Sequence, residues 1–381
     1  MWEMIQNKRL IFGCGKVRET ADILDLLNVK KVFIIVYDSN APILAKIKNN
    51  ISLKGINYAI YDKVRLEPDL FVIDEGATIL QNEKCDGILA IGGGSVIDAA
   101  KAIAMLVTNG GSIEEYQMQG KPILNETLPL MVIPTTSGTG SEATKVSVIS
   151  NNHNGLKKSI YSPYMIPDIV VLDPEVTFSL PAGLTASTGI DALSHAIESY
   201  VSLNANQYTE MFSLNAIELI NTSLIRAVQH GDDVKARSNM MLASYMAGCA
   251  INAGIGIAHI IAQPLGGMLK IPHGEACSIF LPLSMEYNLE YSMKKYRVIA
   301  EKLGVSSKDD NDIIIAKQGI EKVKNIIMQV GTDCNISKYI KDYEFNIEQI
   351  TETVYSSTGH IKCNPRPVDS ILLKEIIGKA I

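Results

Sequence analysis

Short apolar, β-branched runs alternate with longer segments of helical period over the first 180 residues of the chain. The first strong run, KKVFIIVYD at 30–38, is followed by a helical segment at 40–53. Parallel strands joined by helical crossovers produce this alternation. The same pattern predicts further strands at 57–62, 87–95, 128–134, 145–150 and 167–174, helices at 68–84 and 95–108, and a hairpin turn at 151–155. We therefore expect an α/β domain built on a parallel sheet.

Beyond residue 181 the β-branched runs fade and amphipathic helical periods take over. Helices are predicted at 184–203, 208–230 and 234–253, and over most of 276–381. A chain of 381 residues is longer than single hydrophobic cores usually grow. We therefore expect two domains, an α/β domain at 1–181 and an all-helical domain at 182–381, with the active-site cleft between them.

Composition and charge exclude several classes of partner. The chain has a net charge of −6, and its lysines are dispersed, so no basic stripe is present for nucleic acid. The N-terminus lacks the apolar core of a signal peptide, and every apolar run is interrupted before eighteen residues. The expected location is the cytoplasm, with no membrane partner. The six cysteines form no C-x-x-C pair, so we expect reduced thiols, with Cys277 as a small buried apolar residue.

A glycine cluster lies between a predicted strand and a predicted helix in the stretch GILAIGGGSVIDAAK. Gly92, Gly93 and Gly94 allow the backbone to approach a phosphate, and the helix that begins near Ser95 offers free N–H groups. The stretch is not the G-x-G-x-x-G fingerprint, and a tight strand-to-helix turn also requires glycine. The cluster therefore fits either a diphosphate site or a purely structural turn.

Two further polar features point to a dinucleotide. Asp38 ends the first strong strand, where a carboxylate accepts hydrogen bonds from ribose hydroxyls and repels a 2′-phosphate, which favours NAD over NADP. The alternative is that Asp38 only caps the next helix. The loop PTTSGTGSEAT supplies the hydroxyls of Thr135, Thr136 and Thr139 next to glycines. These threonines either contact the cofactor or form an ordinary polar loop.

One aspartate and three histidines make a candidate metal site. Asp191 and His195 are four residues apart in GIDALSHAIESY, so they share a helix face, as a surface hydrogen-bonded pair also would. His259 and His273 flank the pair Gly266-Gly267 in HIIAQPLGGMLKIPHG, where we expect the helix to break and the chain to turn. This oxygen and nitrogen donor set suits Fe(II) or Zn(II).

Taken together, these motifs resemble those of the iron-containing alcohol dehydrogenases, a metal-dependent family with the dehydroquinate synthase-like fold. The resemblance covers nearly the whole length through GGGSVIDAAK, PTTSGTGSEAT, the long stretch from KKSIYSPYMIP to IDALSHAIESY, AHIIAQPLGG, PHG and NPRP. It implies an NAD-binding domain at 1–181 and a metal-binding helical domain at 182–381.

The resemblance also implies roles for individual residues, carried over by motif. It implies metal ligation by Asp191, His195, His259 and His273; diphosphate binding by Gly92 to Ser95, with Asp98 and Lys101 in the following helix; ribose binding by Asp38; and cofactor contacts by Thr135, Thr136 and Lys158.

This chain departs from the family at one position near the substrate. Many relatives have a second histidine one turn after the third metal ligand, where this chain has Gln263. A glutamine can orient a substrate or water but does not titrate near neutral pH. Our hypothesis is that His360, in GHIKCNPRP, replaces this proton relay or supplies positive charge for an anionic substrate. The alternative is an exposed histidine at a helix end.

The expected function is hydride transfer between NAD(H) and a short primary alcohol or aldehyde, with Fe(II), or alternatively Zn(II), as Lewis acid. Three alternatives stay open: a reductase of an aldehyde bearing phosphonate or carboxylate, a glycerol dehydrogenase-like or dehydroquinate synthase-like enzyme, and a catalytically silent binding protein. The expected partners are a small-molecule substrate and a second copy of the chain, in a homodimer or larger assembly.

Overall fold

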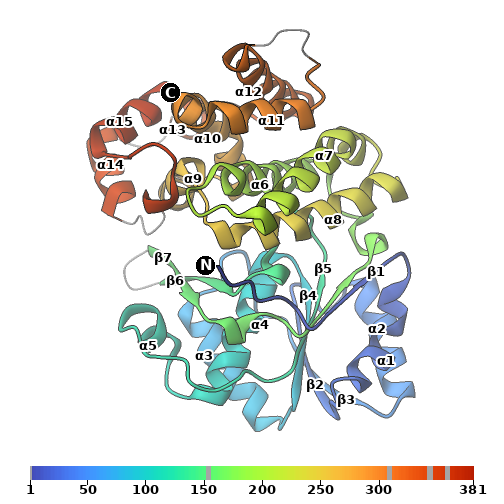
Figure 1. Ribbon diagram of the computed structural model, residues 1–381. Helices are drawn as coiled ribbons and strands as arrows, with labels where there is room; N and C mark the ends of the chain where they lie inside the picture. Colours follow the sequence, from blue (N-terminus) through green and yellow to red (C-terminus); the bar gives the residue numbers. More distant parts are fainter. Residues whose placement is uncertain (1, 152–155, 307–310, 341–345, 357–360) are drawn as a thin grey trace. The chain divides into compact units, whose positions relative to one another are not determined.

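The computed structural model describes residues 2–151, 156–306, 311–340, 346–356 and 361–381 (Figure 1). The chain divides into two compact units. The sheet unit comprises Glu3–Thr136 and Ser141–Ser179, and the helical unit comprises Trp2, Ser137–Gly140 and Leu180–Ile381. Among the described residues no single helix is long and apolar enough to cross a membrane; only the pair Val234–Ala253 and Ile257–Leu269, bent by 104°, meets that length and composition jointly.

The sheet unit is built on a six-stranded, fully parallel sheet with the order β1-β8-β5-β4-β2-β3. The strands are β1 (Arg9–Phe12), β2 (Lys31–Val36), β3 (Asn57–Tyr61), β4 (Gly87–Gly92), β5 (Leu130–Pro134) and β8 (Ile169–Leu172). All residues of β4, β5 and β8 are buried, because parallel sheets are covered on both faces. The predicted parallel sheet is confirmed.

Helices cover both faces of this sheet (Figure 1). They are α1 (Thr20–Asp25), α2 (Pro42–Leu53), α3 (Leu70–Asn82) and α4 (Gly94–Asn109), while α5 (Ile113–Met118) packs on α3 and β7. Alternate β2 residues Val32, Ile34 and Val36 share one core with α1 and α2. The intervening positions face the layer of α3 and α4 on the other side, since side chains alternate along a strand.

Two strands lie outside the main sheet. β6 (Val146–Asn151) pairs antiparallel with β7 (Leu156–Tyr161). The predicted hairpin turn at 151–155 falls mostly on residues 152–155, which lie outside the described residues. The hairpin is attached to the rest of the unit through α4, because the Asp98 carboxylate accepts a hydrogen bond from the Val148 N–H at 3.1 Å.

A buried lysine fastens α4 to the segment before this hairpin. The Lys101 ammonium, with 0% exposure, donates to the Thr144 hydroxyl at 3.0 Å and to the Val146 carbonyl at 2.8 Å. Burial lowers the pKa of Lys101 to about 8. Burial also raises the pKa of the neighbouring Glu142 carboxyl to about 7, against the opposing pull of its own backbone N–H and of Lys101. These groups therefore make the sheet unit sensitive to pH.

Glu142→Gln should raise the free energy of unfolding at pH 8 by about 2 kcal/mol and change it little at pH 5. A carboxyl whose pKa is raised on folding stabilises the protein below its unfolded pKa, and this stabilisation is lost as pH rises through about 7. Urea unfolding at the two pH values measures the effect. Glu126→Gln, at an exposed glutamate of the same unit, should show no such difference. Equal changes at both pH values would contradict the prediction.

The helical unit contains only helices among its described residues. They are α6 (Ala182–Val201), α7 (Gln207–Gln229), α8 (Val234–Ala250), α9 (Ile257–Leu269), α10 (His273–Asn288), α11 (Met293–Lys302), α12 (Asp312–Gln329), α13 (Ser337–Ile340), α14 (Ile347–Ser356) and α15 (Ser370–Lys379). α6 is buried along nearly its whole length. The predicted helical half is confirmed, and α6 is its centre.

The turn between α9 and α10 differs from the prediction. The expected break at Gly266-Gly267 is wrong, because α9 continues to Leu269 and the chain turns at Lys270, whose φ is +54°. The Ile271 N–H then donates to the Gly266 carbonyl at 3.0 Å. A Cβ at Gly266 would lie 3.2 Å from the Ile271 carbonyl oxygen, so glycine accommodates the returning chain rather than forming the turn.

Candidate functional site

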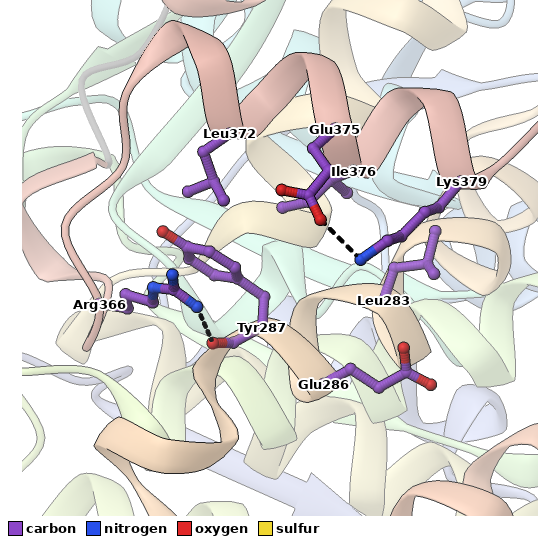
Figure 2. Close-up of a pocket in the computed structure, with 8 residues that line it drawn as sticks. All are labelled: Leu283, Glu286, Tyr287, Arg366, Leu372, Glu375, Ile376 and Lys379. Atoms are coloured by element: carbon purple, nitrogen blue, oxygen red, sulfur yellow. Dashed lines mark hydrogen bonds and ion pairs between the residues drawn. The ribbon is translucent and has the colours of Figure 1, made fainter.

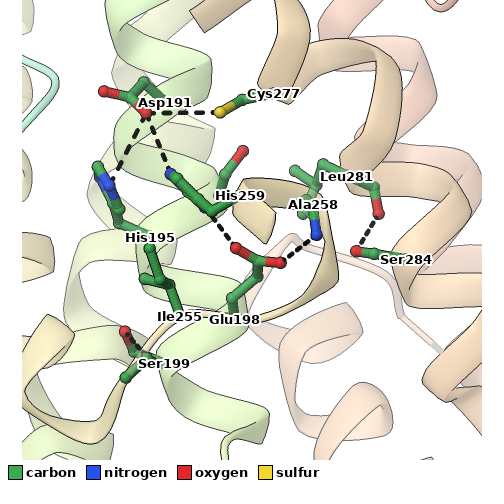
Figure 3. Close-up of polar contacts among 12 residues, drawn as sticks. Asp191, His195, Glu198, Ser199, Ile255, Ala258, His259, Cys277, Leu281 and Ser284 are labelled. Carbon is green, nitrogen blue, oxygen red and sulfur yellow. Dashed lines mark hydrogen bonds and ion pairs between the residues drawn. The ribbon is translucent and has the colours of Figure 1, made fainter. Parts of the chain in front are cut away.

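Three helices of the helical unit bring one carboxylate and three imidazoles together. Figure 3 shows Asp191 with His195 and His259. Asp191 and His195 lie one turn apart on α6, His259 lies in the first turn of α9, and His273 is the first residue of α10. Gly274 allows α10 to begin here, since a Cβ at that position would lie 2.1 Å from the Ser187 carbonyl oxygen of α6. The four predicted ligand positions are thus adjacent in space.

The Asp191 Oδ1 atom is the centre of this cluster. The Nε2 atoms of His259, His273 and His195 lie 3.4, 3.6 and 3.8 Å from it, respectively. In a tetrahedral site with metal–ligand distances of about 2.0–2.2 Å, neighbouring ligand atoms are about 3.4 Å apart. The separations from Asp191 therefore match those of donors that share one cation. The chemistry of the donor set, one oxygen and three nitrogens, fits Fe(II) or Zn(II).

Burial and charge set the protonation states of the cluster. Burial alone would raise the pKa of Asp191, but the surrounding imidazoles outweigh it and lower the pKa of that carboxyl. Burial also lowers the pKa of His195 to about 3. Burial alone would lower the pKa values of His259 and His273 as well, but their acidic neighbours outweigh it and raise both. Metal binds an ionised carboxylate and neutral imidazoles, so it would displace protons from these two histidines. The His273 side chain is 41% exposed whereas His195 and His259 are buried, so the cluster is accessible at His273.

Glu198 is a functional residue that sequence reasoning missed. Its carboxylate contacts His259 Nδ1 and accepts a hydrogen bond from the Ala258 N–H at 2.7 Å (Figure 3). With Nδ1 held by the carboxylate, His259 presents Nε2 to Asp191, as in the carboxylate–histidine pairs that support metal sites. Its place seven residues after Asp191, on the same face of α6, was the available signal.

Cys277 belongs to the same cluster. Its Sγ lies 3.7 Å from Asp191 Oδ1 and 3.8 Å from His273 Nε2. The side chain is fully buried in the apolar core of the helical unit, as predicted, but its sulfur also approaches two polar donor groups.

The glycine cluster lies at the carboxyl end of the sheet. β4 ends at Gly92, Gly93 is the N-cap of α4, and Gly94 and Ser95 begin that helix. The Thr135 N–H donates to the Gly92 carbonyl at 3.0 Å. A Cβ at Gly93 would lie 3.2 Å from the Thr136 side chain, so the two loops are in close contact. The glycine loop and the Thr135–Thr136 segment are therefore adjacent at the N-terminus of α4, the end of a helix that offers free backbone N–H groups.

The whole chain matches one protein family. Residues 7–174 match the family described as iron-containing alcohol dehydrogenase, and residues 185–381 match the Fe-containing alcohol dehydrogenase family, C-terminal. The chain belongs to the iron-containing alcohol dehydrogenases. The glycine loop lies within the first matched region, and the cluster around Asp191 lies within the second.

Individual relatives cover nearly the full length. The chain is 39% identical over 370 residues to alcohol dehydrogenase 4 of Saccharomyces cerevisiae (strain YJM789), covering 95% of each chain. It is 37% identical over 378 residues to an NAD-dependent methanol dehydrogenase of Bacillus methanolicus, covering 97% of each. Among solved structures, 1,3-propanediol oxidoreductase superposes with a TM-score of 0.95 at 30% identity and full coverage of both chains. These relatives are similar in sequence and fold along both units.

Within this iron-containing alcohol dehydrogenase, Asp38 follows β2, which neighbours β4 in the sheet. Its carboxylate accepts a hydrogen bond from the Asn40 N–H at 2.9 Å and is exposed. Asp38 does not cap α2, because the N-cap is Ala41, followed by Pro42. The carboxylate therefore lies at the same sheet edge as the glycine loop, as a ribose-binding residue should.

Three other residues predicted to contact the cofactor, Asp98, Thr139 and Lys158, lie in three different surroundings. Both carboxylate oxygens of Asp98 accept protein hydrogen bonds, from Ser141 at 2.5 Å and from Val148 at 3.1 Å. Thr139 lies in the segment Ser137–Gly140, which belongs to the helical unit. Lys158 pairs with Ile149 in the β6–β7 ladder and is exposed.

Lys157, the residue before Lys158, was missed by the sequence reasoning. Its ammonium forms an ion pair with Glu67, and the Glu67 N–H donates to the Ser95 hydroxyl at 3.4 Å. Neighbouring strand residues point to opposite faces, so Lys157 and Lys158 do not share a face of β7. The register of β7 against β6 is needed to tell which lysine lies on which face, and the sequence does not give that register.

Gln263 lies one turn after His259 on α9 and is half-buried. His360, the second residue predicted to act in proton transfer, lies outside the described residues. A separate cavity of 170 Å³ opens between α10 and α15, lined among others by Tyr287, Arg366 and Ile376 (Figure 2). It shares no residue with the metal cluster and is smaller than the roughly 300–1,000 Å³ of most ligand pockets.

Proposed function

We propose that this protein transfers a hydride between NAD(H) and a short primary alcohol or aldehyde, using a divalent iron held by Asp191, His195, His259 and His273. The observation that carries the proposal is the convergence of three Nε2 atoms on Asp191 Oδ1 from three helices. Matches to alcohol dehydrogenases over both halves favour this activity over the glycerol dehydrogenase-like and dehydroquinate synthase-like alternatives.

The metal ligands and Gln263 have different roles at the proposed site. When bound, the divalent ion supplies Lewis acidity that stabilises negative charge on the substrate oxygen. Asp191 neutralises one positive charge of the ion, and the neutral imidazoles neutralise none. Gln263 orients the substrate or a water by hydrogen bonding, and since an amide does not titrate, it takes no part as acid or base.

The sheet unit would bind the cofactor. The N-terminus of α4 and the glycine loop hold the diphosphate, and Thr135 and Thr136 add hydroxyl donors beside it. Asp38 accepts hydrogen bonds from the adenosine ribose. Hydride transfer then requires the nicotinamide and the substrate carbon to be held in contact, which lowers the barrier by positioning.

Metal reconstitution tests this function. Protein stripped with a chelator should be inactive, and anaerobic addition of Fe(II) should restore NADH formation from short primary alcohols. Zn(II) should occupy the same site, because it binds nitrogen and oxygen donors at least as tightly. Full activity of metal-free protein, or no turnover of any alcohol or aldehyde after reconstitution, would refute the proposal.

Asp38→Gly should reduce the preference for NAD over NADP at least about tenfold, since a unit charge a few ångströms from the 2′-phosphate changes the binding energy by about 1–4 kcal/mol. The ratio of kcat/KM for the two cofactors is the measurement. Asp22→Ala, which removes an exposed carboxylate from α1, is the matched control and should leave the ratio unchanged. A wild-type enzyme that prefers NADP would refute the role of Asp38.

A further inference from the structure

Cys277 occupies a position that the proposed four-ligand site does not use. It lies one turn after His273 on α10, on the side that faces α6 and α9. Figure 3 shows its sulfur directed at Asp191, on the side of that carboxylate away from His195. Cys277 belongs to the apolar core of the helical unit, yet its Sγ also approaches a carboxylate oxygen and an imidazole nitrogen, contacts that space-filling alone does not require.

The distances match those of a ligand atom. With a zinc–sulfur distance of about 2.3 Å and a zinc–oxygen or zinc–nitrogen distance of about 2.1 Å, donors about 120° apart in a five-coordinate site are about 3.8 Å from each other. The Sγ separations from Asp191 Oδ1 and His273 Nε2 are 3.7 and 3.8 Å. Ligand atoms of Asp191, His259, His273 and Cys277 all lie within 4.8 Å of one another. His195 is not in this group of four, although its Nε2 lies 3.8 Å from Asp191 Oδ1. The four ligand atoms of this group are one oxygen, two nitrogens and one sulfur.

We propose that the Cys277 thiolate is a fifth protein donor at the metal centre, and that it shifts the metal preference of this protein from Fe(II) toward Zn(II). The proposal rests on the metal site of the proposed function and adds a ligand to it. A thiolate is a soft donor that zinc accepts readily. With carboxylate and imidazole donors alone, the metal that occupies the site depends on which metal is available to the protein. The competing role for Cys277 is a thiol that donates a hydrogen bond to Asp191 and never touches the ion.

Cobalt substitution separates these two roles without reference to activity. Co(II)-loaded wild-type protein should show a near-ultraviolet thiolate-to-cobalt charge-transfer band, which a hydrogen-bonding thiol cannot produce. The band should disappear in Cys277→Ser and Cys277→Ala. It should persist in Cys249→Ser, which removes another buried thiol, on α8, that is not among the clustered donors. Zinc-loaded protein should show a sulfur neighbour at about 2.3 Å by X-ray absorption.

Metal competition measures the consequence for selectivity. The ratio of Zn(II) to Fe(II) affinities should fall at least about tenfold in Cys277→Ser, a loss in the range seen when metal-site residues are replaced. Wild-type protein that binds cobalt stoichiometrically but shows no charge-transfer band would overturn the role of Cys277 and leave the four-ligand site standing. Wild-type protein that binds no metal would overturn the proposed function itself. The spectrum of the Co(II)-loaded wild type tests thiolate ligation by itself, so the proposal can be refuted even if a Cys277 variant fails to fold.

Discussion

Asp191→Asn should lose its metal and lower kcat/KM of the reconstituted enzyme at least about 1,000-fold, because several kilocalories of transition-state stabilisation disappear with the ion. Asp191 Oδ1 is the common neighbour of all three Nε2 atoms, at 3.4 to 3.8 Å. Asparagine keeps the shape of the side chain but removes the only negative charge of the four-ligand set. Metal analysis after desalting and anaerobic assays with Fe(II) measure both effects.

Thermal unfolding distinguishes lost metal binding from a damaged fold. A ligand that binds only the native state raises its stability by mass action, so added zinc should raise the Tm of the wild type and not that of Asp191→Asn. Ser194→Ala, which removes a buried hydroxyl three residues further along α6, is the matched control and should keep its metal. Retention of stoichiometric metal by Asp191→Asn would show that the cluster is not the metal site.

Most of the fold could be predicted because its elements have strong periodicity. The buried strands β2 and β4 are continuous apolar runs, and α4, α6 and α7 have long helical periods. β1 was not predicted, since it has only four residues, mostly exposed, and no alternating pattern. Its position is fixed by pairing with β8, more than 150 residues later, which no local pattern reveals.

The turn between α9 and α10 shows a second limit of local reasoning. Two adjacent glycines usually interrupt a helix, yet α9 continues through them to Leu269. Tertiary contact overrides the intrinsic cost of glycine here, because the returning chain at Ile271 lies against Gly266 and needs the missing side chain. Lys270 then adopts the left-handed conformation that the sequence would have assigned to a glycine.

The candidate site was only partly predictable, for a physical reason. Histidine is an infrequent residue and a common metal ligand, so three histidines and an aspartate could be recognised in the sequence as candidate ligands. Glu198 and Cys277 do not, because most glutamates are solvated and most cysteines are buried for packing. Their roles depend on which helices meet, and that information exists only in three dimensions.

Glu198→Gln should weaken metal binding about 10- to 100-fold, the usual effect of removing a partner that orients a ligating histidine. The carboxylate accepts hydrogen bonds on both oxygens, from His259 Nδ1 and from the Ala258 N–H. Glutamine replaces one of these oxygens with an NH₂ donor, so one of the two donors loses its acceptor. His259 is then free to rotate or change tautomer, and Nε2 no longer points steadily at the ion. Competition with a chelator gives the Kd.

A positioning role and a merely structural role differ in how the activity of this variant responds to metal. If Glu198 acts through His259, saturating metal should restore kcat of Glu198→Gln to within about tenfold of the wild type, while the metal Kd stays raised. A structural defect would lower kcat at every metal concentration. Glu210→Gln, at a partly exposed glutamate of α7 that pairs with Lys295, should leave the Kd unchanged. An unchanged Kd in Glu198→Gln would show that His259 holds its orientation by helix packing alone.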